Sequence, residues 1–367
     1  MRLVTVKSVE PGVRLGRDIY SDNGQILLYK GAVLTDRLLD RLIDVGVFFI
    51  YIEDQLTEDI LVDSVIREET KQRALQSIKH EFKTISEQAT LNKTMNLDHV
   101  SKSFSSIVDS ILEDIQGNTD ALGMLSDTYI YDNYIFTHSL NVTIYSLGLA
   151  VKLGFSRKQL QEIGLGALLH DVGKVAIPVE VLNKPGRLEK EEFDLVKTHA
   201  RAGFDLLRDI PNIPLLAAHC AFQHHERLDG NGYPRGLSAD LIHPYAKIIG
   251  IADVFDAVTS HRVYRKPMLP HEGLELLYAG ADRLFDKKLI EAFRETISIY
   301  PVGLTVKLND GRLGIVVKQN RNMSTHPVIR IFKENGRKVD SPYDIDLMEN
   351  INTTIVETEA TLASCIK

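Results

Sequence analysis

The spacing of apolar residues changes abruptly near the end of this chain of 367 residues. From about Thr119 to Tyr300, apolar positions recur at helical spacing and β-branched runs are few. Beyond Pro301, the segments GLTVKL, GIVVKQ and PVIRIF alternate as strands do, and Asn309-Asp310-Gly311 and Asn335-Gly336 stand where hairpin turns belong. The pattern predicts a mainly α protein in which a helical bundle precedes a small β domain.

Two shorter segments precede the helical tract. The first predicts a small α/β unit, because the strand VTVKSV, a hairpin turn at Asp22-Asn23-Gly24 and a helix capped by Thr35 follow one another. The second predicts polar helices whose sparse apolar stripes need a neighbour in the same chain or in a partner subunit. The predicted domains are the α/β unit over 1–56, a helical connector over 57–118, the bundle over 119–300 and a β-barrel-like domain with a tail over 301–367.

Composition and charge exclude several classes of protein. The formal net charge is −7 and the pI is near 6.0, unlike a general nucleic-acid binder, so we expect no nucleic-acid polymer as a partner. No apolar run approaches the roughly 18 uncharged residues that span a bilayer, and the N-terminus lacks a signal peptide's apolar stretch. Cys220, expected to be buried, and Cys365 form no paired motif. We therefore expect a cytoplasmic protein without membrane insertion.

Histidines are concentrated in the helical tract, where nine of the chain's 12 lie between His138 and His271. A single histidine on an apolar helix is more often a satisfied core residue than a ligand, and His219 illustrates that case. His170-Asp171, at the end of an apolar helix, could hold one metal ion or serve two. The pair by itself leaves metal binding and a structural role equally open.

Asp253 favours the metal interpretation. It stands in the apolar run AKIIGIADVFDAV, where a carboxylate is costly unless it is paired or bound to metal. Imidazole and carboxylate together suit Fe, Mn, Zn or Co better than Mg. Seven such groups from five helical segments exceed the needs of one tetrahedral site. A bundle can converge them on two ions, which at about 3.5–4 Å apart activate water for in-line displacement at phosphorus.

Two motifs stand in order in the helical tract, His170-Asp171-Val-Gly-Lys174 and His224-His225-Glu-Arg-Leu-Asp-Gly-Asn-Gly232-Tyr233-Pro234. Further pieces accompany them: Thr137-His138-Ser139, Lys184-Pro185-Gly186, His199, Ala252-Asp253 and Arg262-Val-Tyr-Arg265. A His-Asp pair alone is a weak signal, but the ordered set is specific. Over roughly 119–300, about half of the chain, it strongly resembles the HD-GYP branch of the HD phosphohydrolase superfamily.

The resemblance implies a bacterial second-messenger enzyme with a helical fold. Its activity would be hydrolysis of cyclic di-GMP to pGpG, GMP or both, by attack of a metal-bridging hydroxide on the phosphodiester. The resemblance implies two or three divalent transition-metal ions, often iron or manganese, and Asp171 would bridge two of them. The implied ligands are His138, His170, Asp171, His199, His224, His225 and Asp253.

The resemblance also implies substrate contacts. The catalytic residues would be Asp171 and Lys174, and Lys174 would touch the scissile phosphate or the leaving oxygen. The implied substrate-binding residues are Lys174, Tyr233, Asp256, Arg262 and Arg265. The two arginines stand three residues apart just after a helix, and guanidinium forks match phosphate oxygens bidentately. By themselves, two such arginines would favour a solvated charged face.

Tyr134 marks a departure from the family pattern. Members with a third metal carry a glutamate one helical turn before the first histidine, and Tyr134 occupies that position here. A phenol with a pKa of about 10 is a weak ligand near neutral pH. We therefore expect two metals, with Tyr134 lining the site, and the choice between pGpG and GMP stays open.

Two other functions stay open beside the phosphodiesterase. One is an adaptor that holds cyclic di-GMP or a GGDEF-type diguanylate cyclase without hydrolysis. It would predict missing ligands, and none of the binuclear set is missing. The other is hydrolysis of a related nucleotide such as cyclic GMP-AMP, which pocket shape decides. A regulatory N-terminal unit and a homodimer formed through residues 57–118 are further predictions.

Overall fold

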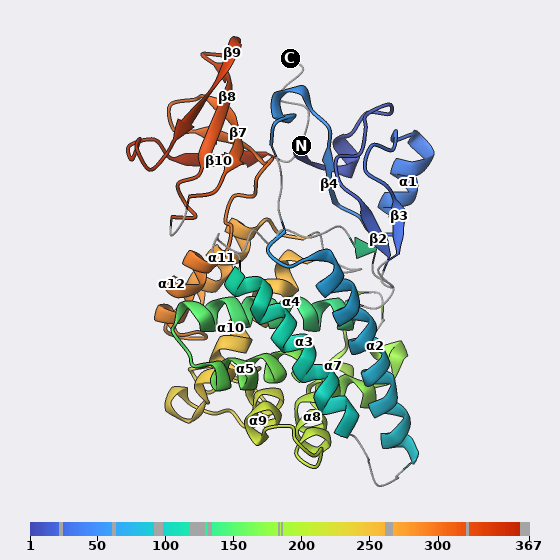
Figure 1. The fold of residues 1–367 in the computed structure, drawn as a ribbon. Helices are drawn as coiled ribbons and strands as arrows, with labels where there is room; N and C mark the ends of the chain where they lie inside the picture. Colours follow the sequence, from blue (N-terminus) through green and yellow to red (C-terminus); the bar gives the residue numbers. More distant parts are fainter. Residues whose placement is uncertain are drawn as a thin grey trace. The chain divides into compact units, whose positions relative to one another are not determined.

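The chain divides into two compact units, each of which gathers segments far apart in the sequence (Figure 1). One unit, a helical bundle, comprises residues 66–118 and 133–293. The other, built mostly of strands, comprises residues 1–65, 119–132 and 294–367. The computed structural model describes residues 1–21, 25–60, 64–91, 98–117, 129–130, 134–182, 184, 186–260, 267–320 and 323–359.

The helical unit is centred on α4 (Tyr134–Lys152), α5 (Arg157–Leu169) and α10 (Pro244–Thr259), which contact one another. Their sequences are apolar on most faces, as expected of helices that are buried all round. α9 (Leu215–Gln223) packs on α5, and α8 (His199–Leu207) packs on α9. The unit's shorter elements are η3 (Val172–Ala176), α6 (Val179–Leu182), α7 (Lys190–Lys197), η4 (Ala239–Leu241), α11 (Pro270–Ala279) and α12 (Lys287–Thr296, whose last turn falls in the other unit).

Two long helices, α2 (Glu68–Leu91) and α3 (Asp98–Gly117), pack on each other and on α4. α3 also contacts α5. The apolar stripes of this segment therefore find a neighbour within the same chain.

Glycines allow α5 to approach its neighbours closely. A Cβ on Gly166 would lie 2.8 Å from Sγ of Cys220 on α9, and one on Gly164 would lie 2.5 Å from Cγ1 of Val108 on α3. Neither distance is sterically allowed, so larger residues would push these helices apart. Cys220 is buried, as predicted, and Cys365 lies outside the described residues.

The strand-rich unit begins with short N-terminal elements. β1 (Arg2–Thr5) pairs antiparallel with β4 (Phe49–Ile52). β2 (Ile19–Ser21) pairs antiparallel with β3 (Ile26–Leu28) and parallel with β5 (Tyr129–Ile130). Two single helical turns complete this part, η1 (Val6–Ser8) and η2 (Gln55–Thr57).

The N-terminal helix α1 (Asp36–Asp44) begins as predicted after Thr35, whose hydroxyl accepts a hydrogen bond of 3.4 Å from the amide of Leu38. Leu39 and Leu42 face the core. The predicted hairpin turn at residues 22–24 lies outside the described residues, although the two flanking strands pair.

The C-terminal part is a five-stranded antiparallel sheet in the order β10-β6-β7-β8-β9. Asn335 and Gly336 join the last pair with φ angles of 49° and 76°, the left-handed backbone that an Asn-Gly turn supplies. Bundle, α/β unit and sheet together confirm the predicted fold class. The strands are β6 (Thr305–Leu308), β7 (Leu313–Lys318), β8 (Val328–Glu334), β9 (Arg337–Asp346) and β10 (Ile355–Glu359).

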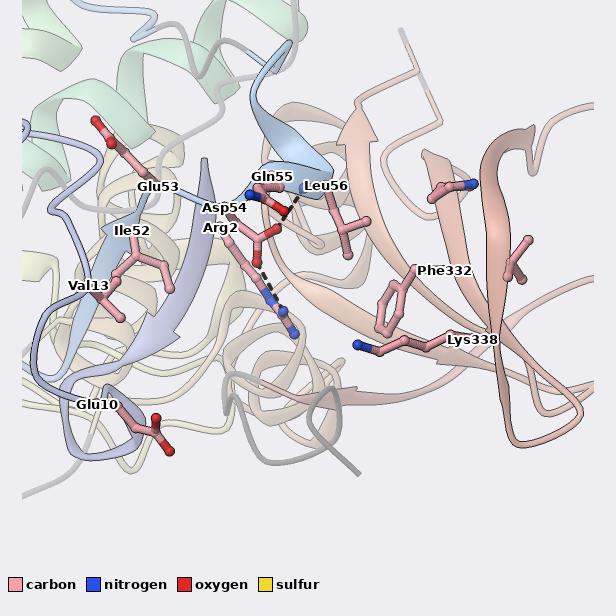
Figure 2. Close-up of a pocket in the computed structure, with 12 residues that line it drawn as sticks. Arg2, Glu10, Val13, Ile52, Glu53, Asp54, Gln55, Leu56, Phe332 and Lys338 are labelled. Atoms are coloured by element: carbon pink, nitrogen blue, oxygen red, sulfur yellow. Dashed lines mark hydrogen bonds and ion pairs between the residues drawn. The ribbon is translucent and has the colours of Figure 1, made fainter.

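A buried arginine joins the N-terminal and C-terminal parts of the strand-rich unit (Figure 2). Arg2 donates hydrogen bonds of 3.0 and 3.3 Å to the hydroxyl of Thr305 on β6 and pairs with Asp54 at 3.3 Å. We call these three residues the Arg2 cluster. Beside it lies a cavity of about 430 Å³, lined from the C-terminal side by Phe332 and Lys338.

Among the described residues, no helix combines the length and the apolar character that crossing a bilayer requires. The two compact units group residues by their contacts and combine segments that are distant in the sequence. The domain boundaries predicted from the sequence at 56/57, 118/119 and 300/301 therefore stay predictions.

Candidate metal centre

Seven imidazole and carboxylate groups, the predicted metal ligands, come together inside the helical unit. Six are buried and the seventh, His225, is half-buried. Most stand at helix ends, where a side chain can leave the helix axis and reach a common centre. Their positions are α4 (His138), the end of α5 (His170 and Asp171), the start of α8 (His199), the end of α9 (His224 and His225) and α10 (Asp253).

Helix backbone fixes the ring protons of three histidines. The Nδ1 atoms of His170, His199 and His224 lie 2.6, 2.7 and 2.9 Å from the backbone carbonyl oxygen three residues earlier. A carbonyl oxygen only accepts hydrogen bonds, so each Nδ1 carries the proton and donates it. Each Nε2 then presents a lone pair, which is the form that binds metal.

The first cluster consists of Asp171, His199, His224 and His225, whose ligand atoms all lie within 4.8 Å of one another. Nε2 of His199 lies 3.3 Å from Oδ1 of Asp171 and 3.4 Å from Nε2 of His224. Two imidazole lone pairs at that separation repel each other. A cation between them would turn this repulsion into attraction.

The second cluster consists of His138, His170 and Asp171. Here Oδ2 of Asp171 faces the two rings, at 3.6 Å from Nε2 of His138 and 3.3 Å from Nε2 of His170. Asp171 thus belongs to both clusters and turns one oxygen toward each. This is the arrangement expected of a carboxylate that bridges two ions.

Asp253 faces both clusters from α10. Its oxygens lie 3.1 Å from Nε2 of His138 and 3.6 Å from Nδ1 of His225. Within the described part of the chain, the two clusters are the groups whose donors could hold a metal ion.

Two buried atoms of the centre have no hydrogen-bond partner, Oδ1 of Asp171 and Nε2 of His170. A buried polar atom left unsatisfied costs about 1–3 kcal/mol. Both atoms are electron-pair donors, Oδ1 of Asp171 in the first cluster and Nε2 of His170 in the second, so a cation in each cluster would satisfy them. The donor set of five imidazoles and two carboxylates therefore fits a divalent transition metal.

The electrostatics of the cluster favour the metal-binding forms. Burial lowers the pKa of His224 to about 3, helped by the neighbouring histidines, and lowers the pKa of His199 and His225 as well. Burial opposes ionisation of Asp171, yet Lys174 and the nearby rings hold the pKa of its carboxyl well below the usual range. Three neutral imidazoles thus face an ionised carboxylate.

His138 behaves differently. Burial opposes its protonation, but the carboxylates of Asp253 and Asp256 outweigh burial and raise its pKa to about 9. Without a cation, a proton neutralises the carboxylates around this ring. A metal ion that enters here must displace that proton.

Comparison with known families bears directly on this centre. A family model described as an HD domain matches residues 112–289, which hold all seven candidate ligands. The Gly232-Tyr233-Pro234 loop follows the histidine pair His224-His225 within that range. Residues 112–289 form an HD-GYP domain. A second family model, a KOW domain associated with the HD domain, matches residues 305–361 and covers the five-stranded sheet.

Curated relatives of the HD-GYP domain are phosphodiesterases. A cyclic di-GMP phosphodiesterase of Pseudomonas aeruginosa is 36% identical over 241 residues, 66% of this chain and 58% of that one. The cyclic di-GMP phosphodiesterase response regulator RpfG of Xanthomonas campestris is 43% identical over 144 residues, 39% of this chain and 38% of that one. The 3'3'-cGAMP-specific phosphodiesterase 2 of Vibrio cholerae is 38% identical over 159 residues, 43% of this chain and 30% of that one. The chain thus spans between about a third and three-fifths of the length of these relatives.

Lys174 of the HD-GYP domain lies at the metal centre, in the 3-10 turn η3 directly after Asp171. Its Nζ is 2.5 Å from Oδ2 of Asp171. Gly173 makes this turn fit, because a Cβ there would lie 2.0 Å from the carbonyl oxygen of His199. The ammonium group of Lys174 is therefore held beside Asp171, the candidate bridging carboxylate. Contact between Lys174 and a substrate phosphate stays a prediction.

The GYP loop brings Tyr233 to the same centre. Its ring packs at a tilt against the ring of His225, with centroids 4.5 Å apart and an interplanar angle of 31°. Burial, followed by the charges of Asp253 and Asp171, raises the pKa of the phenol, so it stays protonated. The tyrosine ring therefore forms part of the wall of the metal centre.

Glu226 anchors this loop, a role that sequence analysis missed. Its buried carboxylate accepts hydrogen bonds of 2.8 Å from the amides of Arg235 and Leu237. The only signal in the sequence was its place directly after His224-His225. A charged residue there, next to two candidate ligands, could have been expected to need buried partners.

Of the remaining predicted site residues, the structure describes some and not others. Arg262 and Arg265 lie outside the described residues. Tyr134 is the first residue of α4, and its side chain is likewise outside the described part. Asp256, predicted to bind substrate, is buried and lies against His138.

Proposed function

We propose that the HD-GYP domain hydrolyses cyclic di-GMP with two divalent transition-metal ions, iron or manganese. The observation that carries this proposal is the position of Asp171, which turns one oxygen toward each cluster while Oδ1 lacks a protein partner. The relatives from Pseudomonas aeruginosa and Xanthomonas campestris, both named cyclic di-GMP phosphodiesterases, support the substrate.

The residues divide into two ligand sets. Bound ions would supply activation of water and charge stabilisation at phosphorus. Asp171 with His199, His224 and His225 would hold one ion, and Asp171 with His138 and His170 the other. Asp253 faces both sets.

Other side chains would hold the substrate. The ammonium of Lys174 stands where it can offset the negative charge that develops on a phosphodiester. The ring of Tyr233 offers an aromatic face near the ions, on which a guanine base can stack. Arg262 and Arg265 are proposed to hold phosphates by their guanidinium forks.

The number of ions and the product are part of the proposal. Tyr134 stands where a third metal would need a carboxylate, so we propose two ions. The product would be pGpG, GMP or both.

A second substrate is favoured by one comparison. A relative from Vibrio cholerae that is 38% identical over 159 residues is named a 3'3'-cGAMP-specific phosphodiesterase. The same metal chemistry serves both dinucleotides, which differ in one purine base. Side chains around the base, Tyr233 among them, would decide between the two.

Several wider predictions stay proposals. They are a cytoplasmic location, a homodimer through residues 57–118, a regulatory role for the N-terminal residues, and GGDEF-type diguanylate cyclases as partners. Crosslinking of the purified protein, with and without a GGDEF protein, would test both the homodimer and the GGDEF-type partner.

Anaerobic purification, metal analysis and product separation test the proposed function. The protein should contain two ions of iron or manganese per chain and convert cyclic di-GMP to pGpG, GMP or both. Asp171→Ala protein serves as the inactive control, and 3'3'-cGAMP as the competing substrate. Metal-loaded protein that hydrolyses neither dinucleotide would overturn the proposal.

A further inference from the structure

Asp256 is a buried carboxylate that none of the candidate metal sites includes. It lies on α10 about one turn after Asp253 and is 1% exposed. Its Oδ2 is 2.7 Å from Nδ1 of His138 on α4. An ionised carboxylate accepts only, so Nδ1 of His138 carries the proton and donates it to Asp256.

The second oxygen of Asp256 is also fully engaged. Oδ1 accepts a hydrogen bond of 2.9 Å from the side-chain amide of Asn141 and one of 2.8 Å from the hydroxyl of Ser260. Asn141 lies one turn after His138 on α4, and Ser260 follows the last residue of α10. The carboxylate is therefore held from two helices, and its orientation toward the imidazole is fixed.

This contact distinguishes His138 from His170, His199 and His224. The Nδ1 atoms of His170, His199 and His224 face neutral backbone carbonyls, whereas that of His138 faces a carboxylate. A carboxylate behind a ligating histidine fixes its ring orientation and makes its other nitrogen a stronger donor. Nε2 of His138 points at Asp253 and Asp171, at 3.1 and 3.6 Å.

We infer that Asp256 is a positioning residue for the second metal ion, acting through His138, and that it does not contact the substrate. Asp256 is 1% exposed, and both of its oxygens already accept hydrogen bonds from side chains of the protein, so its carboxylate is not open to a dinucleotide. The sequence-based prediction that Asp256 binds substrate is replaced by this role. The inference rests on the proposed function, because it assigns Asp256 to one of the proposed ions.

Metal titration of Asp256→Asn tests the inference without relying on turnover. The variant keeps the side-chain shape but loses the charge behind His138. Mn²⁺ binding to the metal-free protein, followed by equilibrium dialysis, should show one of two sites weakened about 10–100-fold. The other site should change much less, and KM of the loaded variant for cyclic di-GMP should stay close to that of the wild type.

Ser260→Ala is the matched control. It removes one of the two bonds to Oδ1 and leaves the contact with His138, so its loss of Mn²⁺ affinity should be smaller than that of Asp256→Asn. Unchanged Mn²⁺ binding in Asp256→Asn, with a raised KM, would overturn the inference in favour of substrate contact. Wild-type protein that binds neither Mn²⁺ nor Fe²⁺ would instead overturn the proposed function.

A measurement on the wild type covers the case in which Asp256→Asn does not fold. In protein loaded with diamagnetic Zn²⁺, nitrogen-15 NMR should show the His138 ring protonated at Nδ1 and coordinated through Nε2. Coordination through Nδ1 would contradict the inference, because that atom could not then donate to Asp256.

Discussion

The Arg2 cluster and the metal centre both bury charged groups, and they satisfy them differently. In the Arg2 cluster, the guanidinium finds the carboxylate of Asp54 and the hydroxyl of Thr305 within the chain. In the metal centre, Oδ1 of Asp171 and Nε2 of His170 are buried and find no protein partner.

This difference separates a structural role from a ligand-binding one. A buried charge with partners inside the chain can hold two segments together without any further component. Buried lone pairs that converge without donors cost free energy in the isolated chain. A bound cation would offset that cost, which accounts for the convergence of these lone pairs in a folded protein.

The largest effect is expected at Asp171. Because its two oxygens serve both clusters, Asp171→Ala should remove both ions and abolish hydrolysis of cyclic di-GMP together. Metal analysis of the anaerobically purified variant, beside a turnover assay, checks this. Two ions per chain with wild-type turnover would show that Asp171 does not bridge them.

Lys174 should affect the reaction more than binding. Its ammonium stands beside Asp171, where the proposed reaction would develop negative charge on the phosphodiester, so Lys174→Ala should lower kcat on the order of 10²-fold. Steady-state kinetics with metal-loaded protein measure this, and KM should change little. A large rise in KM with kcat intact would move Lys174 to a binding role.

Arg262 provides the opposite case. Arg262→Ala should chiefly weaken substrate binding, by about 1.5–3 kcal/mol for a lost charged hydrogen bond. Calorimetry with pGpG and the metal-loaded protein measures this. Equal losses of kcat and of affinity in both the Lys174 and the Arg262 variants would contradict the division between chemistry and binding.

Substitutions in the Arg2 cluster should change the stability of the protein and leave its metal content unchanged. Arg2→Met removes its charged hydrogen bonds and should lower the free energy of unfolding of the strand-rich unit by about 1.5–3 kcal/mol, with metal content unchanged. The matched control is Asp59→Asn, which breaks a more exposed ion pair with Arg330 and should cost below about 1 kcal/mol. Urea unfolding followed by circular dichroism measures both changes in stability. Loss of metal in Arg2→Met would show that the Arg2 cluster does not have a purely structural role.

The smallest effect concerns pH and the metal-free protein. The folded pKa of His224 is about 3, below its ordinary value, so the unfolded chain binds more protons at acid pH. The stability that this residue contributes is present above about pH 6.5 and is lost as pH falls toward 3. His138, with its pKa raised to about 9, acts in the opposite sense: its contribution is complete below pH 6.5 and is lost as pH rises toward 9.

Thermal melts of chelated protein at pH 7, 6 and 5 test this balance. Because His199 and His225 shift in the same direction as His224, the melting temperature should fall with pH. His224→Gln should flatten the fall. An unchanged slope in that variant would show that His224 does not contribute to the fall.

Sequence determined the fold class and the content of the site. Helical spacing, Asn-Gly turns and the Thr35 cap are local features, so the bundle, α1 and the C-terminal sheet followed from residues close together in the chain. The candidate ligands could be named because the ordered motifs resemble the HD-GYP family, and the cost of a carboxylate such as Asp253 in an apolar helix supported that assignment. The chemistry of these residue types is independent of their neighbours.

Tertiary structure alone decided which partner each group has. The family resemblance implied that Asp256 binds substrate, yet its carboxylate lies 2.7 Å from Nδ1 of His138, 118 residues away. Glu226 was overlooked because its partners are backbone amides of a loop. Likewise, Arg2 meets Thr305 across nearly the whole chain. Burial and pairing depend on contacts between distant residues, and the spacing of residues along one chain does not encode those contacts.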